Sequence, residues 1–330
     1  MTATTTIREM PARTMRAGLL WASQQEAFAR LAASNPATGM LVRRFVAGET
    51  LEEALAALRR LRARGLGTTV DVLGEAVHSR AAATAAADRY VALLQALTEA
   101  DLDANVSLKL TQMGLDLERE FCAQNVARIV EAAASRGAFV RIDMEDHLRT
   151  DTTLAIAREL HATYRAVGVV IQAYLRRSVD DVDALIKEGI RVRLCKGAYN
   201  EPVSVAFAAK EEVDANYLLL AQRLLREADY PALATHDETI IRRLCAFCEK
   251  EGIDRSRFEF QMLYGVRRDL QQRLRQDGYG VRVYVPFGTE WYPYFMRRLA
   301  ERPANVLFLL RSVLREGGRP GRQRPTRPAA

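Results

Sequence analysis

Three basic side chains stand in a stretch that otherwise predicts a buried strand. Residues 190–200 read IRVRLCKGAYN, in which apolar positions alternate with Arg191 and Arg193 and Lys196 follows directly. A buried cation is costly unless a partner neutralises it. We therefore expect these cations to face a carboxylate, an anionic ligand or both.

Polar side chains occupy comparable positions in other apolar runs. Because alternate residues of a strand face one side of the sheet, two such residues in one run point the same way. This groups Ser107 with Lys109, Arg141 with Asp143, Arg191 with Arg193 and Cys195, and Arg282 with Tyr284, while Gln172 and Gln261 stand in otherwise apolar runs. We expect all of them to project toward one common site, where Asp143 supplies negative charge for Arg193 or Lys109.

A further cluster follows the last strand-like run, in GTEWYPYFMRRLAERPANV (288–306). Pro293 suits the first turn of a helix. Tyr294 then lies three and four residues before Arg297 and Arg298, so the three share a helix face. Two guanidiniums beside an aromatic ring suit a small carboxylate ligand whose body stacks on the ring.

The elements that would position these residues alternate along the chain. Short β-branched or apolar runs are separated by longer segments of helical period. The runs are residues 67–75, 105–114, 138–146, 168–178, 190–200, 230–237, 258–265 and 281–288. Eight such runs, each followed by a helix, predict an α/β fold of the closed (βα)8, or TIM-barrel, type, with its site at the carboxyl ends of the strands. A doubly wound open sheet is the alternative, but it would want a Gly-rich turn where this chain reads DVLGEAVHS.

Three regions are expected along the chain. Residues 1–66 predict an N-terminal helical segment that covers one end of the barrel, and Thr50 and Glu53 have capping-box spacing within it. The barrel is expected over residues 67–312, with the substrate-binding helix last. Residues 313–330 are rich in Gly, Pro and Arg and predict a disordered basic tail.

Composition indicates a folded intracellular protein. Of 330 residues, 49% are hydrophobic and 27% charged, as a sizeable core requires. The Thr-rich N-terminus lacks the apolar core of a secretory signal, and four cysteines give no disulfide framework, so we expect a cytoplasmic location. Cys245 and Cys248 have C-x-x-C spacing but lie in a predicted amphipathic helix, and we expect no metal site. The net charge is +7, yet basic patches interleaved with aromatics are absent outside the tail, so no nucleic-acid partner is expected.

The strand-like runs and the segment after them resemble one known family. VSLKLTQMG, RIDMED, IQAYLRRS, VRLCKGAY, ATHD, FEFQMLYGV and VYVPFGTEWYPYFMRRLAERPANV resemble, in order, the motifs of proline dehydrogenase in its monofunctional bacterial form. The resemblance runs from about residue 40 to about residue 310, and FVAGETLEEAL resembles the family's N-terminal helices. Because the chain ends where the barrel should end, we expect the aldehyde dehydrogenase module of the bifunctional enzymes to be missing.

The resemblance implies a barrel that binds FAD and oxidises L-proline to 1-pyrroline-5-carboxylate, the first step of proline catabolism to glutamate. Hydride would pass from carbon 5 of the ring to N(5) of the flavin. A membrane quinone would reoxidise the flavin, with peripheral contact at the inner membrane through the basic tail or the helices before residue 66. A pyrroline-5-carboxylate dehydrogenase would act downstream.

The resemblance also assigns roles position by position. Asp143 matches the family's acidic active-site residue, and Arg193 matches the arginine near flavin N(5). Arg297, Arg298 and Lys109 would bind the substrate carboxylate. Leu263, Tyr284 and Tyr294 would wall the proline ring, and Tyr199 would close the site. The residues that would line the FAD are Met144, Gln172, Arg193, Cys195, Lys196, Gly197, Ala198, Thr235, His236 and Gln261.

Several alternatives stay open at the level of sequence. Lys109 or Lys196 could form a Schiff base with a carbonyl substrate or pyridoxal phosphate, although no Gly-rich phosphate loop follows the last runs. A non-enzymatic binder of nucleic acid or membrane would explain the basic tail but not the buried polar residues. A related flavin barrel could act on another cyclic amine, but Tyr284 favours unsubstituted proline because its ring would crowd a hydroxyl. Asp143 either takes the proton of the proline nitrogen or only holds Lys109 or Arg193 in place.

Overall fold

The computed structural model describes residues 36–74 and 76–301. These residues divide between two compact units, one spanning residues 45–289 and the other including residues 36–44 and 290–301. The domain boundaries expected at residues 66 and 312 stay a prediction, and most of the N-terminal segment and the whole basic tail lie outside the described residues.

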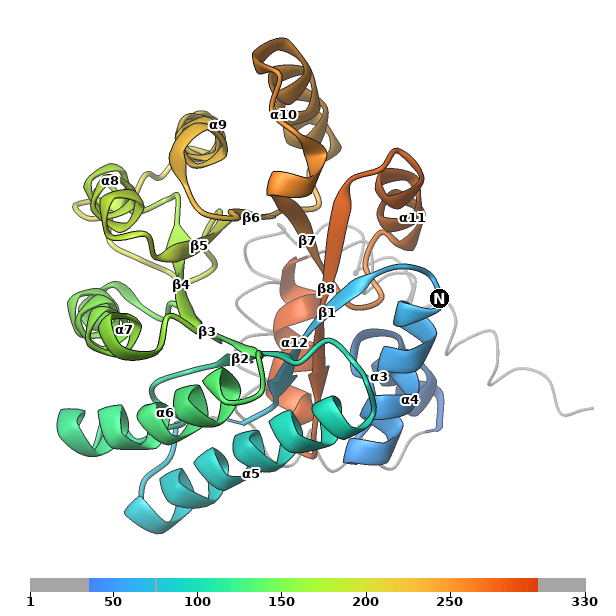
Figure 1. The fold of residues 1–330 in the computed structure, drawn as a ribbon, viewed down its shortest axis with the longest axis vertical. Helices are drawn as coiled ribbons and strands as arrows, with labels where there is room; N and C mark the ends of the chain where they lie inside the picture. The colour runs from blue at the N-terminus through green and yellow to red at the C-terminus, as the bar shows by residue number, and fades with distance from the viewer. Residues whose placement is uncertain (1–35, 75, 302–330) are drawn as a thin grey trace, which may run out of the picture. The chain divides into compact units, whose positions relative to one another are not determined.

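Helices and strands alternate through the chain (Figure 1). The elements are α3 (Pro36–Phe45), α4 (Leu51–Arg62), β1 (Gly67–Val72), α5 (Arg80–Glu99), β2 (Asn105–Leu108), α6 (Arg119–Ala134), β3 (Phe139–Ile142), η2 (His147–Arg149), α7 (Thr150–Tyr164), β4 (Val167–Gln172), α8 (Ser178–Glu188), β5 (Arg191–Cys195), α9 (Lys210–Glu227), β6 (Ala232–Ala234), α10 (Glu238–Glu251), η3 (Arg255–Arg257), β7 (Glu259–Leu263), α11 (Arg268–Gln276), β8 (Gly280–Phe287) and α12 (Trp291–Glu301).

The strands close into one parallel barrel in chain order, from β1 to β8. Strand β1 pairs with β2 on one side, with Val70 opposite Val106, and with β8 on the other, with Val70 opposite Val285. The predicted (βα)8 fold is therefore confirmed, and the open doubly wound sheet is excluded.

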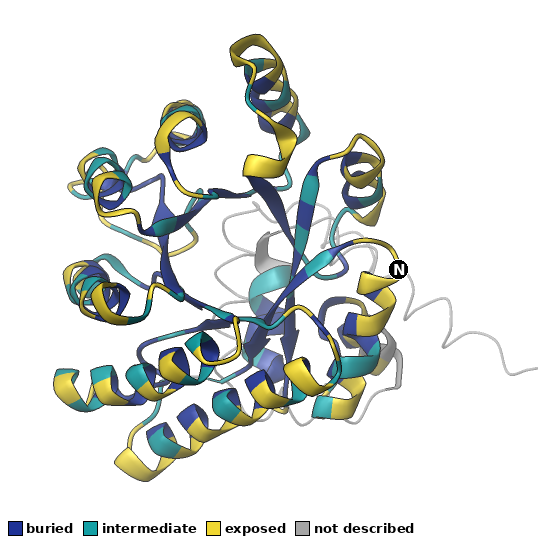
Figure 2. Cartoon of the chain, viewed as in Figure 1, coloured by how far each residue is buried: buried dark blue, intermediate teal, exposed yellow. Residues whose placement is uncertain are grey.

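The strands are buried because the helices cover them from outside (Figure 2). Strand β4 is buried along its whole length, as expected for a parallel strand covered on both faces. Helix α5 shows how a helix meets this wall: its buried residues include Ala83, Ala86, Tyr90 and Leu97, which recur at helical spacing on one face.

The start of helix α4 follows its sequence signal. The Thr50 hydroxyl accepts the Glu53 N–H, and the Glu53 carboxylate accepts the Thr50 N–H, which completes the predicted capping box. Beyond the helix, Gly65 has a positive φ of 71° and turns the chain toward β1.

A charged layer fills the barrel near the amino ends of its strands. Arg282 donates to the Glu259 carboxylate at 2.7 Å and to the Thr68 carbonyl at 2.7 Å. Arg141 is buried and donates to the carbonyls of Val169 and Arg191. Burial lowers the pKa of Arg141, and the nearby Arg193 lowers it further.

The expectation that Arg141, Arg191 and Arg282 point toward the site was wrong. Arg191 pairs with Asp229 at 2.9 Å, while Arg141 and Arg282 belong to the layer at the amino ends. Strand alternation determines the face on which a side chain lies, but not its height along the barrel axis.

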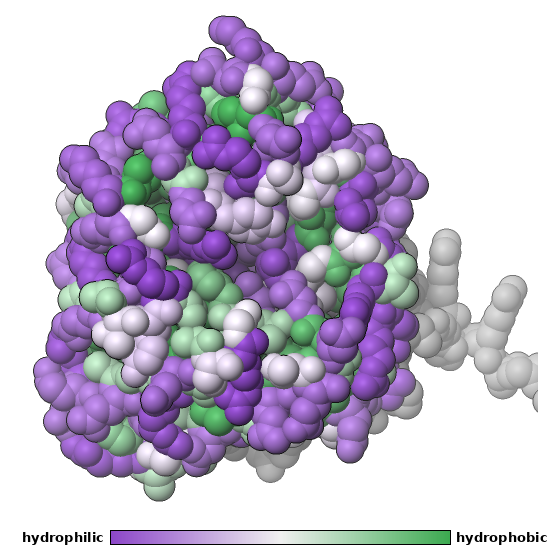
Figure 3. Space-filling model, viewed as in Figure 1, coloured by the Kyte–Doolittle hydropathy of each residue, from purple (hydrophilic) through white to green (hydrophobic). Residues whose placement is uncertain are grey.

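None of the described helices is long and apolar enough to cross a bilayer. Figure 3 shows that hydrophilic side chains cover most of the face turned to the viewer, with apolar side chains in small separate patches.

Candidate active site

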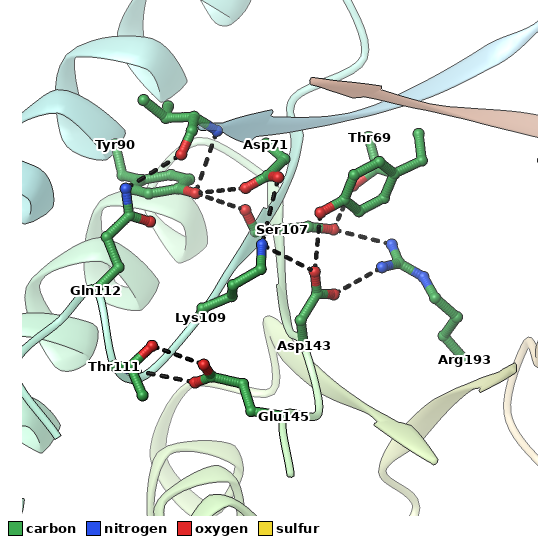
Figure 4. A network of polar contacts seen from close by, with 12 residues as sticks. Thr69, Asp71, Tyr90, Ser107, Lys109, Thr111, Gln112, Asp143, Glu145 and Arg193 are labelled. Atoms are coloured by element: carbon green, nitrogen blue, oxygen red, sulfur yellow. Dashed lines mark hydrogen bonds and ion pairs between the residues drawn. The ribbon is translucent and has the colours of Figure 1, made fainter. Parts of the chain in front are cut away.

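Four of the predicted site residues meet in one polar network at the carboxyl ends of the strands (Figure 4). Asp143, directly after β3, is at its centre. Its Oδ1 accepts Arg193 Nη1 at 2.8 Å, its Oδ2 accepts the Tyr284 hydroxyl at 2.9 Å, and Lys109 Nζ lies 3.9 Å from Oδ2. Asp143 therefore joins strands that are far apart in the sequence.

Arg193 is held inside the barrel from two sides. Its side chain is 6% exposed, its Nη2 donates to Ser107 Oγ at 2.9 Å, and its guanidinium carbon lies 5.4 Å from the centroid of the Tyr284 ring. The Ser107 hydroxyl also pairs with Thr69 at 3.0 Å. The charge in IRVRLCKGAYN that faces the barrel interior is thus neutralised by Asp143.

Lys109 lies between two carboxylates. Its Nζ is 3.4 Å from Asp71 Oδ2 and 3.9 Å from Asp143 Oδ2. Burial alone would lower the pKa of Lys109, but Asp71 and Asp143 together raise it above its ordinary value. A lysine that stays protonated is a poor nucleophile, which argues against a Schiff base at this position.

Asp71 is a site residue that the sequence interpretation missed. Its side chain is 1% exposed, and its Oδ1 lies 3.2 Å from the hydroxyl of Tyr90. That hydroxyl also donates to the Ser107 carbonyl at 2.8 Å and accepts the Val72 N–H. The available signal was a lone acidic residue in the apolar run GTTVDV; Tyr90 gave none, because it comes from helix α5.

A second polar group supports the loop that follows β3. Glu145 accepts the backbone N–H of Thr111 at 3.0 Å and its hydroxyl at 2.6 Å, while Gln172 donates to the Glu145 carbonyl at 2.8 Å. Burial raises the pKa of Glu145 despite these two bonds from Thr111. Met144, between Asp143 and Glu145, is buried.

His236 is oriented by a backbone contact. The Leu263 N–H donates to His236 Nε2 at 2.9 Å, so in the neutral ring the proton lies on Nδ1. The preceding residue, Thr235, is buried and its hydroxyl accepts the Asp237 N–H at 3.1 Å. This places His236, Thr235 and the half-buried Leu263 together after β6 and at the end of β7.

Lys196 does not join the central network. It pairs with Asp214 on α9 at 2.5 Å and with Asp237 at 3.0 Å. Asp237, to which sequence analysis assigns no role, also caps α10 through the N–H groups of Thr239 and Ile240. These acidic residues line part of a cavity of about 340 Å³ between the first turns of α9 and α10.

The residues around Lys196 differ widely in environment. Burial raises the pKa of the Cys195 thiol to about 12, which agrees with a packing role and not with a nucleophile. Ala198 is exposed, and Tyr199 is 41% exposed. Tyr199 lies near enough to Lys109 to contribute to the raised pKa of that lysine.

The predicted carboxylate clamp lies on α12, in the second compact unit. Within that helix the guanidinium carbon of Arg298 lies 5.2 Å from the centroid of the Tyr294 ring, as expected for residues four apart on one face. Tyr294 is buried and Arg297 is half-buried. The roles of these three residues stay predictions.

Several buried polar atoms lack a hydrogen-bond partner among the residues that the structure describes. Two of them belong to predicted cofactor-lining residues, Nε of Arg193 and Oε1 of Gln261. Buried polar atoms are nearly always paired, so both are suited to contact a bound group. Gln261 Nε2 is already engaged by Glu259 at 2.5 Å.

Comparison with known proteins identifies the family of the chain. The family model for proline dehydrogenase matches residues 54–311. Proline dehydrogenase of Deinococcus radiodurans is 42% identical over 280 residues, 83% of this chain and 90% of that protein. Proline dehydrogenase 1 of Bacillus subtilis subsp. natto is 40% identical over 302 residues, 92% of this chain and all of that protein.

A solved structure gives the same result at the level of the fold. Proline utilization A from Bdellovibrio bacteriovorus, inactivated by N-propargylglycine, aligns with a TM-score of 0.75 at 30% identity, covering 83% of this chain and 34% of that larger one. Together with the family model and the curated relatives, the barrel and its polar network lead to one conclusion. The chain belongs to the proline dehydrogenase family of oxidoreductases.

Proposed function

We propose that the chain binds FAD at the carboxyl ends of the barrel strands and oxidises L-proline to 1-pyrroline-5-carboxylate. The observation that carries this proposal is the buried Arg193, held by Asp143 and Ser107 beside the ring of Tyr284. Membership of the family supports L-proline as the substrate, and the polar network around Arg193 supports a flavin-dependent oxidation.

The residues present suit a flavin. Arg193 Nε and Gln261 Oε1 are buried without a partner among the described residues, and the Leu263 N–H orients the His236 ring through its Nε2. Met144, Gln172, Cys195, Gly197, Ala198, Thr235 and Lys196 complete the proposed cofactor set. Bound there, FAD would supply the hydride acceptor, and a nearby cation favours the reduced, anionic form.

We assign substrate binding to a cationic and aromatic set. Lys109 keeps its charge through Asp71 and Asp143 and is available for the proline carboxylate together with Arg297 and Arg298. Tyr284 is fixed by its bond to Asp143, and with Leu263 and Tyr294 it would wall the ring. Orienting a bound substrate in this way contributes about 7–11 kcal/mol to lowering a barrier.

We assign Asp143 a positioning role. Its carboxylate already accepts Arg193 and the Tyr284 hydroxyl and faces Lys109. Taking a proton from proline would weaken all three contacts at once. We therefore propose that proline enters with a neutral amine from solution, and that Asp143 holds the three surrounding groups in place.

Reoxidation of the flavin is assigned to a quinone, with the chain meeting the membrane peripherally. The support is the overall positive charge, which favours contact with anionic lipid surfaces. No step of proline oxidation in the barrel depends on this assignment.

The first test is a visible absorption spectrum of the protein reconstituted with FAD, before and after anaerobic L-proline. We expect flavin bands that bleach with proline in the natural chain and in the control Arg128→Met, whose arginine pairs with Asp88 at the surface. In Arg297→Met the bands should persist at the same proline concentration, because half of the carboxylate clamp is gone.

Two results would overturn the proposal in different ways. Flavin bands that do not respond to proline would remove the substrate while leaving the cofactor. A protein that takes up no FAD would remove the cofactor assignment.

trans-4-Hydroxyproline should leave the bands unbleached, because the fixed Tyr284 ring would crowd its hydroxyl.

A further inference from the structure

The loop that joins β5 to α9, residues 196–209, contains one buried carboxylate in an exposed stretch. Ala198, Tyr199, Asn200 and Val203 are exposed. Between them, the side chain of Glu201 is only 3% exposed. A carboxylate so deeply buried needs donors to compensate for its lost hydration.

Glu201 receives these donors from two other loops. Its Oε1 accepts the His147 backbone N–H at 2.9 Å, and its Oε2 contacts His147 Nδ1. His147 belongs to η2, after β3. The Tyr174 hydroxyl, after β4, donates to Oε1 at 3.3 Å. One carboxylate thus joins the segments that follow three neighbouring strands.

Tyr174 also holds both ends of the β5–α9 loop. Its backbone N–H donates to the Lys196 carbonyl at 2.9 Å, and its carbonyl accepts the Phe207 N–H at 2.8 Å. Gly197 lies against the ring so closely that a Cβ there would be 2.2 Å from Cδ1 of Tyr174. With the ends of the loop attached in this way, Glu201 attaches its middle.

Tyr199 is two residues from Glu201, is 41% exposed, and lies near Lys109 of the site. We infer that Glu201 is a positioning residue: through His147 and Tyr174 it holds the β5–α9 loop so that Tyr199 stays over the substrate at the barrel mouth. The part of this inference that concerns the substrate rests on the proposed oxidation of proline. The attachment of the loop by Glu201 does not depend on that function.

The experiment combines loop protection with kinetics in Glu201→Ala. Amide hydrogen exchange over residues 198–205 should accelerate about tenfold or more, since bonds to a buried charged group are lost. KM for proline should rise about tenfold with kcat nearly unchanged, because a closing aromatic binds substrate and transition state alike. Val203→Ser, on the exposed part of the same loop, is the control and should leave both quantities as in the natural chain.

A double-mutant cycle separates positioning from general damage. If Glu201 acts through Tyr199, the rise in KM caused by Glu201→Ala should vanish in a Tyr199→Ala background. Glu201→Gln, whose amide oxygen still accepts His147 N–H and Tyr174 OH, should restore most of the protection and KM. Should Glu201→Ala not fold, Tyr174→Phe removes one donor and should show the same changes to a smaller extent.

Two outcomes would overturn the inference. Unchanged exchange over 198–205 would show that Glu201 does not hold the loop. An equal rise in KM with and without Tyr199 would show that it acts on the site by another route. If the natural chain does not turn over proline, the kinetic result fails for all variants alike, whereas the exchange result still tests the attachment.

Discussion

Lys109 owes its charge to two acidic neighbours, and at the scale of single residues this is the most testable property of the site. Burial lowers the pKa of Lys109, while Asp71 and Asp143 raise it and together prevail. A raised pKa means that the ammonium persists as pH rises and is lost only when pH passes the elevated value. Removing one of the two carboxylates should lower the pKa of Lys109, so that its ammonium loses its proton at a lower pH.

In Asp71→Asn we therefore expect the alkaline limb of the kcat/KM profile for proline to move to lower pH. At neutral pH kcat/KM should fall at least about tenfold, as when one partner of a buried charge pair is removed. The measurement is steady-state kinetics across pH, with Asp88→Asn, an exposed pair with Arg128, as control. A profile identical to that of the natural chain would contradict the role given to Asp71.

Sequence alone reached part of this network and not the rest. Asp143, Arg193, Lys109 and Tyr284 were found because strand alternation places them on the inner face. Asp71 was missed because it stands as a lone acidic residue in the run GTTVDV, and its contacts with Tyr90 and Lys109 form only in the fold. Arg141 and Arg282 share the inner face with the site residues but lie at the other end of the barrel.

At the scale of elements, the strands carry the central polar network, and the segments that follow them supply further residues of the proposed site. The alternation of short apolar runs and helical segments was enough to predict the closed barrel, now confirmed by the pairing of β1 with β8. The attachments of the β5–α9 loop were beyond sequence reasoning. The partners of Glu201 stand 54 and 27 positions away, at His147 and Tyr174, and no local pattern links them.

Gly197 tests the close approach of this loop to Tyr174. Its φ is 111°, and a Cβ would lie 2.2 Å from the Tyr174 ring. Gly197→Ala should lower the free energy of unfolding by about 1–3 kcal/mol more than Gly252→Ala does, because overpacking adds to backbone strain. Gly252 also has a positive φ, of 65°, but no atom near its Cβ position. Urea unfolding of both variants measures the difference; equal losses would mean that Tyr174 moves aside without cost.

For the whole molecule, the charged layer at the amino ends of the strands is a stability element apart from the site. Glu259 is buried. Burial raises the pKa of its carboxyl, but its polar neighbours, Arg282 first among them, together lower it by more, so the pKa lies below its ordinary value of 4.5. A carboxyl whose pKa is lower in the folded state than in the unfolded state stabilises the fold at pH values above the unfolded-state pKa. This stability is lost as pH falls through the folded-state pKa.

Glu259→Gln should lower the free energy of unfolding at neutral pH by about 3–5 kcal/mol, because Arg282 and Arg141 lose a buried counter-charge. The difference in free energy of unfolding between this variant and the natural chain should become smaller as pH falls below about 4.5. Asp229→Asn, in an exposed pair with Arg191, should cost about 1 kcal/mol or less. Denaturant titrations at several pH values measure both; similar losses in the two variants would argue against the layer.

The network around Asp143 has one more consequence, which concerns net charge. Two carboxylates, Asp71 and Asp143, face two cations, Lys109 and Arg193. At neutral pH the four side chains together therefore carry no net charge. Beyond about 8–10 Å, where salt screens exposed charges, such a group neither attracts nor repels an approaching molecule. Recognition by these four residues therefore operates at contact distance, where Lys109 can meet the carboxylate of the substrate.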